Sequence, residues 1–200
     1  MKFVLQLMLS ITLIFSAITP AQSDDHPQRL DPRLANSMAN RTDNPLQQAD
    51  YYSQSWDHES ALKALAQSGR TDAEVLWRQA RSLIDSGENL EGDVALVLFE
   101  QAREKAEQAV ELDPENALAQ QTLAVACGRV ALFKGVFKSI GLVKQVYQAA
   151  HRAVALGDSM PIALYVLGRT HKKLMTKSKF MRVPLGLGFA SKDSIGYYFD

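Results

Sequence analysis

The 200-residue sequence has only one cysteine, Cys127. One thiol cannot form a disulfide within the chain, so stability must come from packing. The histidines His26, His58, His151 and His171 lie in different segments, and no two are spaced to place metal ligands on one helix face. The chain also lacks G-x-S-x-G, a phosphate-binding glycine loop and a cysteine cluster. We therefore expect no enzyme activity, no cofactor and no metal site.

Acidic residues are scarce in the second half of the chain. Residues 117–200 hold 3 Asp or Glu against 12 Lys or Arg, whereas residues 24–116 hold 19 against 9. Two interpretations stay open at this point. Either exposed helix faces simply differ in composition, or the basic half meets an acidic partner or an anionic surface. No pattern indicates nucleic acid as the partner.

The N-terminus has the pattern of a targeting segment. Lys2 precedes an apolar run over residues 3–17, and Pro20, Ala21 and Ser23 follow. This pattern predicts a secretory signal peptide over residues 1–23, and hence a protein exported to the periplasm or secreted. The alternative is that the segment is kept as a membrane anchor. Residues 24–45, with Pro27, little periodicity and several Asn, predict a flexible linker.

From residue 46 to residue 200 the pattern is helical, because apolar residues recur at three and four positions and no strand–turn–strand signal appears. The sequence resembles itself after a shift of 44 residues. The shift aligns Ala73 with Ala117 and Pro161, Ala80 with Ala124 and Gly168, Ala102 with Val146, Ala106 with Ala150, Ala109 with Ala153, and Leu112 with Leu156. Small residues at these positions let two helices approach closely. Each unit is therefore a helical hairpin that must stack on its neighbours.

The repeat resembles the tetratricopeptide repeat, in its small-residue spacing and in the "ELDPENA" corner around Pro114. The tetratricopeptide unit is shorter, so we expect about ten extra residues between the paired helices, at residues 88–98 and 131–143. HEAT and armadillo units have a period nearer to the 44-residue shift found here, so they stay as alternatives. The predicted fold is an all-α array of about four hairpins, which begin with a short one at residues 46–67. The last hairpin looks incomplete.

A narrower resemblance covers residues 49–200. The segments "ADYY", "DAEVLWRQAR", "AVELDPENALA", "FKGVFKSIG", "LGRTHKKL" and "SIGYYF" resemble the regulator of microtubule dynamics family. That resemblance implies a helical-repeat fold and association with microtubules or organelle surfaces. It defines no binding residue clearly enough to carry across.

Stacked hairpins line a concave groove with their first helices, so we expect a groove that binds a protein or peptide. The candidate partner-binding residues are Trp77, Arg78, Arg81, Gln121, Thr122, Val125, Arg129, Tyr165, Arg169, Lys172 and Lys173. Aromatic side chains beside fixed cations suit a peptide with acidic groups or a C-terminal carboxylate. The opposing interpretation is that Trp77 and Tyr165 pack between units while the cations are ordinary solvated residues. Oligomeric state is left open.

Two further features have competing interpretations. Cys127 shares its repeat position with Leu83 and His171, which favours a buried core cysteine over a catalytic nucleophile. The segment 171–190 mixes Lys and Arg with apolar residues such as Phe180 and Met181. It is either a membrane-surface segment or an inter-helix loop that folds onto the array. The leading functional hypothesis is a non-catalytic binding scaffold. The alternative is a peripheral membrane-surface or cytoskeleton-associated protein acting through its basic half.

Overall fold

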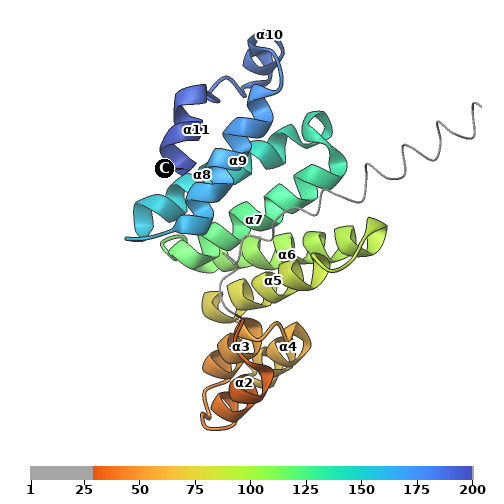
Figure 1. The fold of residues 1–200 in the computed structure, drawn as a ribbon, viewed down its shortest axis with the longest axis vertical. Helices are drawn as coiled ribbons and strands as arrows, with labels where there is room; N and C mark the ends of the chain where they lie inside the picture. Colours follow the sequence, from red (N-terminus) through yellow and green to blue (C-terminus); the bar gives the residue numbers. More distant parts are fainter. Residues whose placement is uncertain (1–28, 200) are drawn as a thin grey trace, which may run out of the picture.

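The structure is a computed structural model that describes residues 29–199, and within that part of the chain every regular element is a helix. In chain order the elements are α2 (Pro32–Ala39), α3 (Pro45–Gln54), α4 (His58–Gln67), α5 (Ala73–Gly87), α6 (Gly92–Leu112), α7 (Ala117–Lys134), the 3-10 turn η1 (Val136–Ser139), α8 (Ile140–Leu156), α9 (Pro161–Met175), α10 (Lys179–Arg182), the 3-10 turn η2 (Val183–Leu185) and α11 (Lys192–Phe199). Figure 1 shows them stacked along one long axis, with α2 toward one end and α10 at the other. The prediction of an all-α array is confirmed.

The first helix of each repeat begins at the residue that the 44-residue shift aligns: α5, α7 and α9 start at Ala73, Ala117 and Pro161. Local side chains explain these starts. A carboxylate oxygen of Asp72 accepts the Val75 amide hydrogen at 3.2 Å, and the side-chain oxygen of Asn116 accepts that of Ala119 at 3.0 Å. Pro161 occupies the first turn of α9, where its missing amide hydrogen costs least.

The helices pack as hairpins, with α3 on α4, α5 on α6, α7 on α8 and α9 on α11. The first helices also form one continuous row, because α3 packs on α5, α5 on α7 and α7 on α9. By contrast, α6 and α8 make at most a marginal contact with each other. In helical-repeat arrays this asymmetry places the first helices on the inner side of the curve.

Small residues lie where helices approach most closely. Ala80 and Ala124 are fully buried and Gly168 is buried, as the repeat predicted. Six aligned residues of the second helices are also buried: Ala102, Ala106, Ala109, Val146, Ala150 and Ala153. The last aligned pair differs, because Leu112 is 60% exposed and Leu156 is half-buried. Gly87 makes a further close contact, since a Cβ atom there would lie 2.6 Å from the ring of Phe99.

The extra residues of each unit are placed differently from the prediction. Only residues 88–91 separate α5 from α6, and α6 is 21 residues long. Likewise α7 continues to Lys134, and only Gly135 and η1 precede α8. The added length therefore mostly extends the paired helices, which enlarges their contact. In the third unit it forms α10 and η2 between α9 and α11.

The structure also differs from the prediction of a flexible linker over residues 24–45. Residues 32–39 form α2, which packs on α3 and buries Ala35 and Ala39. Asp31 caps this helix by accepting the amide hydrogen of Arg33 at 2.7 Å. Pro32 is thus a helix-starting proline. The predicted signal peptide, residues 1–23, lies outside the described residues.

Candidate functional site

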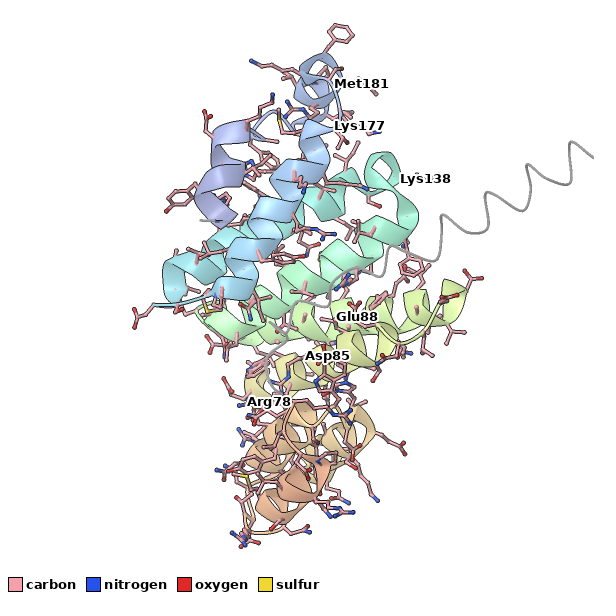
Figure 2. The ribbon with its side chains drawn as sticks, in the orientation of Figure 1. Arg78, Asp85, Glu88, Lys138, Lys177 and Met181 are labelled. Carbon is pink, nitrogen blue, oxygen red and sulfur yellow. The ribbon has the colours of Figure 1, made fainter. Side chains whose placement is uncertain are left out.

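The predicted groove residues lie on α5, α7 and α9, the row of first helices, but the structure gives them different surroundings. Figure 2 shows that Arg78, Asp85 and Glu88 follow one another along α5, while Lys138, Lys177 and Met181 lie toward the other end of the molecule.

On α5, Trp77 and Arg78 are built into the packing between units. The Trp77 side chain is buried at 4% exposure, with the Arg78 guanidinium 4.2 Å from its ring centre. Arg78 donates to both carboxylate oxygens of Asp50 on α3 at 3.0–3.1 Å. It also donates to Glu74 at 2.5 Å. Arg81 reaches the same Asp50 carboxylate at 2.8 Å. Arg78 and Arg81 consequently join α3 to α5, while Trp77 packs in a buried cluster with Ala109 and Ala119. Trp77 and Arg78 therefore offer little free surface to a partner.

Glu74 extends this network to the next unit. Its carboxylate accepts hydrogen bonds from the Trp77 indole at 3.2 Å and from the Asn116 amide, which precedes α7, at 2.6 Å. Burial alone would raise the pKa of Glu74, but hydrogen bonds from Arg78, Asn116 and Trp77 outweigh it and lower that pKa. Glu74 therefore stays ionised and links the starts of α5 and α7.

On α7, the candidates are half-buried or paired. Thr122 is buried and its hydroxyl donates to the carbonyl of Leu118 at 2.8 Å. Gln121 and Val125 are half-buried. Arg129 forms an ion pair with Glu88 at the end of α5. Asp85, one turn before Glu88, lies near His58, Arg81 and Arg129, yet burial dominates and raises its pKa.

On α9, the candidates face solvent. Tyr165 is 51% exposed, and Arg169, Lys172 and Lys173 are exposed as well. Arg169 donates to the Tyr165 hydroxyl at 3.0 Å and lies 5.6 Å from its ring centre. We call these four residues the α9 basic face. It is the part of the predicted groove that presents an aromatic side chain and several cations to the surroundings.

Three ion pairs join the acidic half of the sequence to the basic half. Arg129, Lys134 and Arg152, all in the basic half, pair with Glu88, Glu100 and Glu115 of the acidic half. From α9 onward the situation changes, because residues 159–192 contain seven Lys or Arg and no Asp or Glu. The remaining positive charge thus gathers at the end of the molecule that carries α9 and α10.

Two positions relevant to catalysis are internal. Cys127 is fully buried, and burial raises the pKa of its thiol to about 12. The side chain therefore belongs to the core, as its repeat position indicated. His171 is also buried, and its Nδ1 accepts the amide hydrogen of Ser191 at 3.2 Å. Within residues 29–199, no three His, Cys, Asp or Glu side chains gather as metal ligands would.

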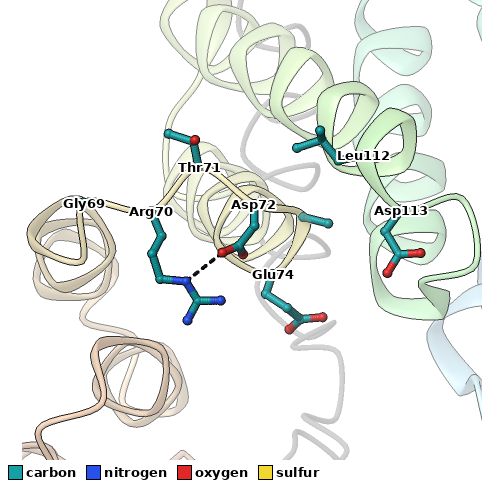
Figure 3. Close-up of a pocket in the computed structure, with 8 residues that line it drawn as sticks. Gly69, Arg70, Thr71, Asp72, Glu74, Leu112 and Asp113 are labelled. Carbon is teal, nitrogen blue, oxygen red and sulfur yellow. Dashed lines mark hydrogen bonds and ion pairs between the residues drawn. The ribbon is translucent and has the colours of Figure 1, made fainter.

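Sequence reasoning missed an open depression of about 820 Å³ where α5 begins and α6 ends. Figure 3 shows Asp72, Glu74 and Asp113 around it, with Arg70 paired to Asp72 at 2.6 Å. Hydrogen bonds from Arg70 and the start of α5 overcome the effect of burial and lower the pKa of Asp72. The depression is acidic and belongs to the first half of the chain, away from the α9 basic face.

One structural feature bears on the membrane alternative. In the part of the chain that the structure describes, no helix combines the length and apolar composition that crossing a bilayer requires.

Comparison with known proteins adds independent information. The family model "Regulator of microtubule dynamics protein 1-3" matches residues 45–186. Regulator of microtubule dynamics protein 1 of Bos taurus is 29% identical over 128 residues, which cover 62% of this chain and 40% of the relative. Regulator of microtubule dynamics protein 3 of Bos taurus is 33% identical over 97 residues, covering 48% of this chain and 21% of the relative. The matches thus span less than half the length of either relative.

These relatives correct one prediction. Both are mammalian proteins named for the regulation of microtubule dynamics. Mammalian cells have no periplasm, and microtubules are polymers of the cell interior. The prediction of a periplasmic or secreted protein, and the signal-peptide interpretation on which it rested, is therefore wrong. An apolar run after one lysine carries too little information to specify export. The match over residues 45–186 shows that this chain belongs to the regulator of microtubule dynamics family.

Proposed function

We propose that this chain is a non-catalytic protein-binding module and that its α9 basic face binds an acidic surface of a protein partner. The names of its relatives make the microtubule, a polymer of an acidic protein, the partner to test first. The observation that carries the proposal is the exposure of Tyr165, Arg169, Lys172 and Lys173 on one helix, within a stretch that contains no acidic residue.

The residue types of the α9 basic face support this role. Arginine and tyrosine are enriched among residues that dominate binding energy, and arginine contacts carboxylates through two parallel hydrogen bonds. The contact of Arg169 with Tyr165 holds the guanidinium against the ring. Less side-chain freedom is then lost when a carboxylate binds.

The separation of charge along the molecule supports a defined orientation of binding. The open depression near Asp72 is acidic, whereas the end that carries α9 is basic. An acidic partner attracts one end and repels the other, which speeds productive encounters and disfavours inverted ones. The proposal requires no reaction. Burial raises the pKa of the Cys127 thiol and so keeps it protonated, which is in keeping with a function that needs no nucleophile.

Co-sedimentation with assembled microtubules tests the proposal. The variant Arg169→Glu/Lys172→Glu/Lys173→Glu reverses three charges on the exposed side of α9. We expect its affinity to fall at least about tenfold, because three attractive contacts become repulsive. Raising the salt concentration should weaken binding by the wild-type chain, since salt screens exposed charges.

A matched control reverses three exposed cations elsewhere, in Arg33→Glu/Arg41→Glu/Lys63→Glu. The control has the same net charge as the α9 variant, so it separates a local contact from the effect of total charge. We expect it to keep more than half of the wild-type binding. Equal losses in the two variants, or no wild-type co-sedimentation even at low salt, would refute the proposal.

A further inference from the structure

Three apolar side chains project from the end of the molecule where α10 joins η2. Phe180 is 90% exposed, Val183 is 52% exposed and Met181 is 45% exposed. We call these residues the α10 tip. Figure 1 shows α10 at the extreme end of the array, and Figure 2 places Met181 there, beyond Lys177. Contiguous exposed apolar groups at a protruding point are unusual on soluble proteins and mark interaction sites.

The base of the tip is firmly held. Arg182 is buried, and its guanidinium donates to the carbonyl oxygens of Lys177 at 3.1 Å and Ala190 at 3.0 Å. Leu187 and Ala190 pack in a buried cluster with Leu174, Val143 and Ala131 of the preceding helices. The exposed apolar side chains of the tip therefore lie on a turn that is held in place. Leu187 and Ala190 of the same segment are buried, whereas the tip residues are not.

The charged residues that adjoin the tip along the chain have one sign. Lys172, Lys173, Lys177 and Lys179 are exposed on the last turns of α9 and the start of α10, and the nearest acidic residues in sequence are Asp158 and Asp193. The apolar tip therefore lies at the very end of the long axis, and Lys177 lies behind Met181. That order matches the layers of a bilayer surface, where anionic headgroups lie outside the acyl region.

We propose that the α10 tip inserts into the surface of anionic membranes, with Phe180 and Met181 among the outer acyl chains and the neighbouring lysines at the headgroups. A bilayer fits better than a protein groove because the tip protrudes at the end of the array and exposed lysines adjoin it along the chain. Attachment through one turn is weak and reversible, so it requires both the apolar and the charged contribution. This role goes beyond protein binding by α9: it shares Lys172 and Lys173 with the α9 basic face and adds the apolar side chains of the α10 tip.

Sedimentation with lipid vesicles tests this inference without any protein partner. The probes are vesicles of phosphatidylcholine alone and vesicles with roughly one-third phosphatidylserine. The full chain should bind only the anionic vesicles and should be released as salt rises. The variant Phe180→Asp/Met181→Asp should lose at least about tenfold in partitioning, because it removes the apolar contacts and adds negative charge.

The control Val94→Asp/Val97→Asp adds the same charge on α6, where both valines are more than half exposed at 62% and 53%. It should bind vesicles within about twofold of the wild-type chain. Thermal unfolding of both variants checks that they fold, which the exposure of all four side chains favours. If the tip variant keeps full vesicle binding, or if the control loses as much, the inference fails.

A second measurement reports insertion itself. Phe180→Cys provides a reactive thiol for an environment-sensitive fluorophore, while Cys127 is buried and stays unlabelled in the folded chain. Anionic vesicles should shift the emission to shorter wavelength. Vesicle binding without such a shift would mean that α9 attaches electrostatically and the tip stays in water, which overturns the inference. Loss of microtubule binding in the tip variant, with no vesicle affinity in the wild type, would reassign the tip to a protein contact.

Discussion

Single small residues set the distance between the helices of this array. Ala80 and Ala124 have no exposed surface, and Gly168 occupies the same place in the third unit. At Ala80 and Ala124 a larger side chain would meet the other buried residues of the core cluster. The repeat is therefore visible in the sequence mainly as small residues that recur at equivalent positions, because a close-packed core has no room for larger side chains there.

A prediction at this scale concerns Ala124. Replacing it in Ala124→Leu forces three extra carbon atoms into a filled core between helices. We expect the free energy of unfolding to fall by about 1–3 kcal/mol. Urea unfolding followed by circular dichroism measures the change. The same substitution at exposed Ala155 on α8 is the control and should alter stability by less than about 0.5 kcal/mol. A similar cost at the two sites would contradict close packing at Ala124.

At the scale of elements, polar contacts decide how hairpins join. Asp50 on α3 receives two guanidinium groups from α5, and Glu74 on α5 receives Asn116 from the start of α7. These hydrogen bonds join one unit to the next, whereas the small apolar residues contribute by packing in the buried core. Each joint between units therefore combines apolar packing with a partly buried charge network.

Asp50→Asn tests the joint between α3 and α5. The change leaves Arg78, whose side chain is only 13% exposed, without one of its two carboxylate partners. We expect a loss of about 1–2 kcal/mol, reduced from a fully buried pair because Asp50 is 30% exposed. Asp43→Asn, at an exposed position, serves as the control. Chemical denaturation compares the two. An unchanged midpoint for Asp50→Asn would show that the network adds no stability.

We expect the stability of the folded chain to depend on pH, because two histidines lie where α11 packs near α8 and α9. His171 lies beside Tyr147 and His151 of α8 and Tyr198 of α11, and burial followed by the nearby His151 lowers its pKa. Burial lowers the pKa of His151 too. In the unfolded chain both imidazoles bind protons more readily. The folded state therefore loses stability as pH falls below about 6.5.

Thermal unfolding between about pH 7.5 and about pH 5.5 measures this effect. We expect the melting temperature to fall on acidification, and His171→Gln should reduce that fall because one of the two titrating groups is gone. Acid stability equal to that at neutral pH, or a variant that depends on pH as strongly as the wild type, would contradict the role given to the histidine pair.

Sequence patterns specified some elements and missed others for physical reasons. Helix starts such as Ala73 and Ala117 were predictable because capping and small-residue spacing are local properties. The helix α2 was missed because Pro32 reads equally as a breaker and as a first-turn residue. The pairing of Arg78 was missed because its partner Asp50 lies 28 residues away. An exposed cation and a paired one look alike until the chain is folded.

The whole molecule is an elongated array with an acidic region near the start of α5 and a basic end at α9 and α10. Ion pairs between units offset Arg129, Lys134 and Arg152, whereas residues 159–192 add seven Lys or Arg and no Asp or Glu. Both proposed contacts therefore lie at one end. A chain held by its α10 tip would present the α9 basic face close to the same surface.

Site-specific photo-crosslinking can detect the proposed contact between α9 and an acidic protein partner. A photoreactive amino acid replaces either Ile162, exposed one turn before Tyr165 on α9, or Val97, exposed on α6. Each protein is irradiated with assembled microtubules. We expect a covalent adduct with tubulin from position 162 and little or none from position 97. Adducts of equal yield from the two positions, or an adduct from position 97 alone, would contradict it.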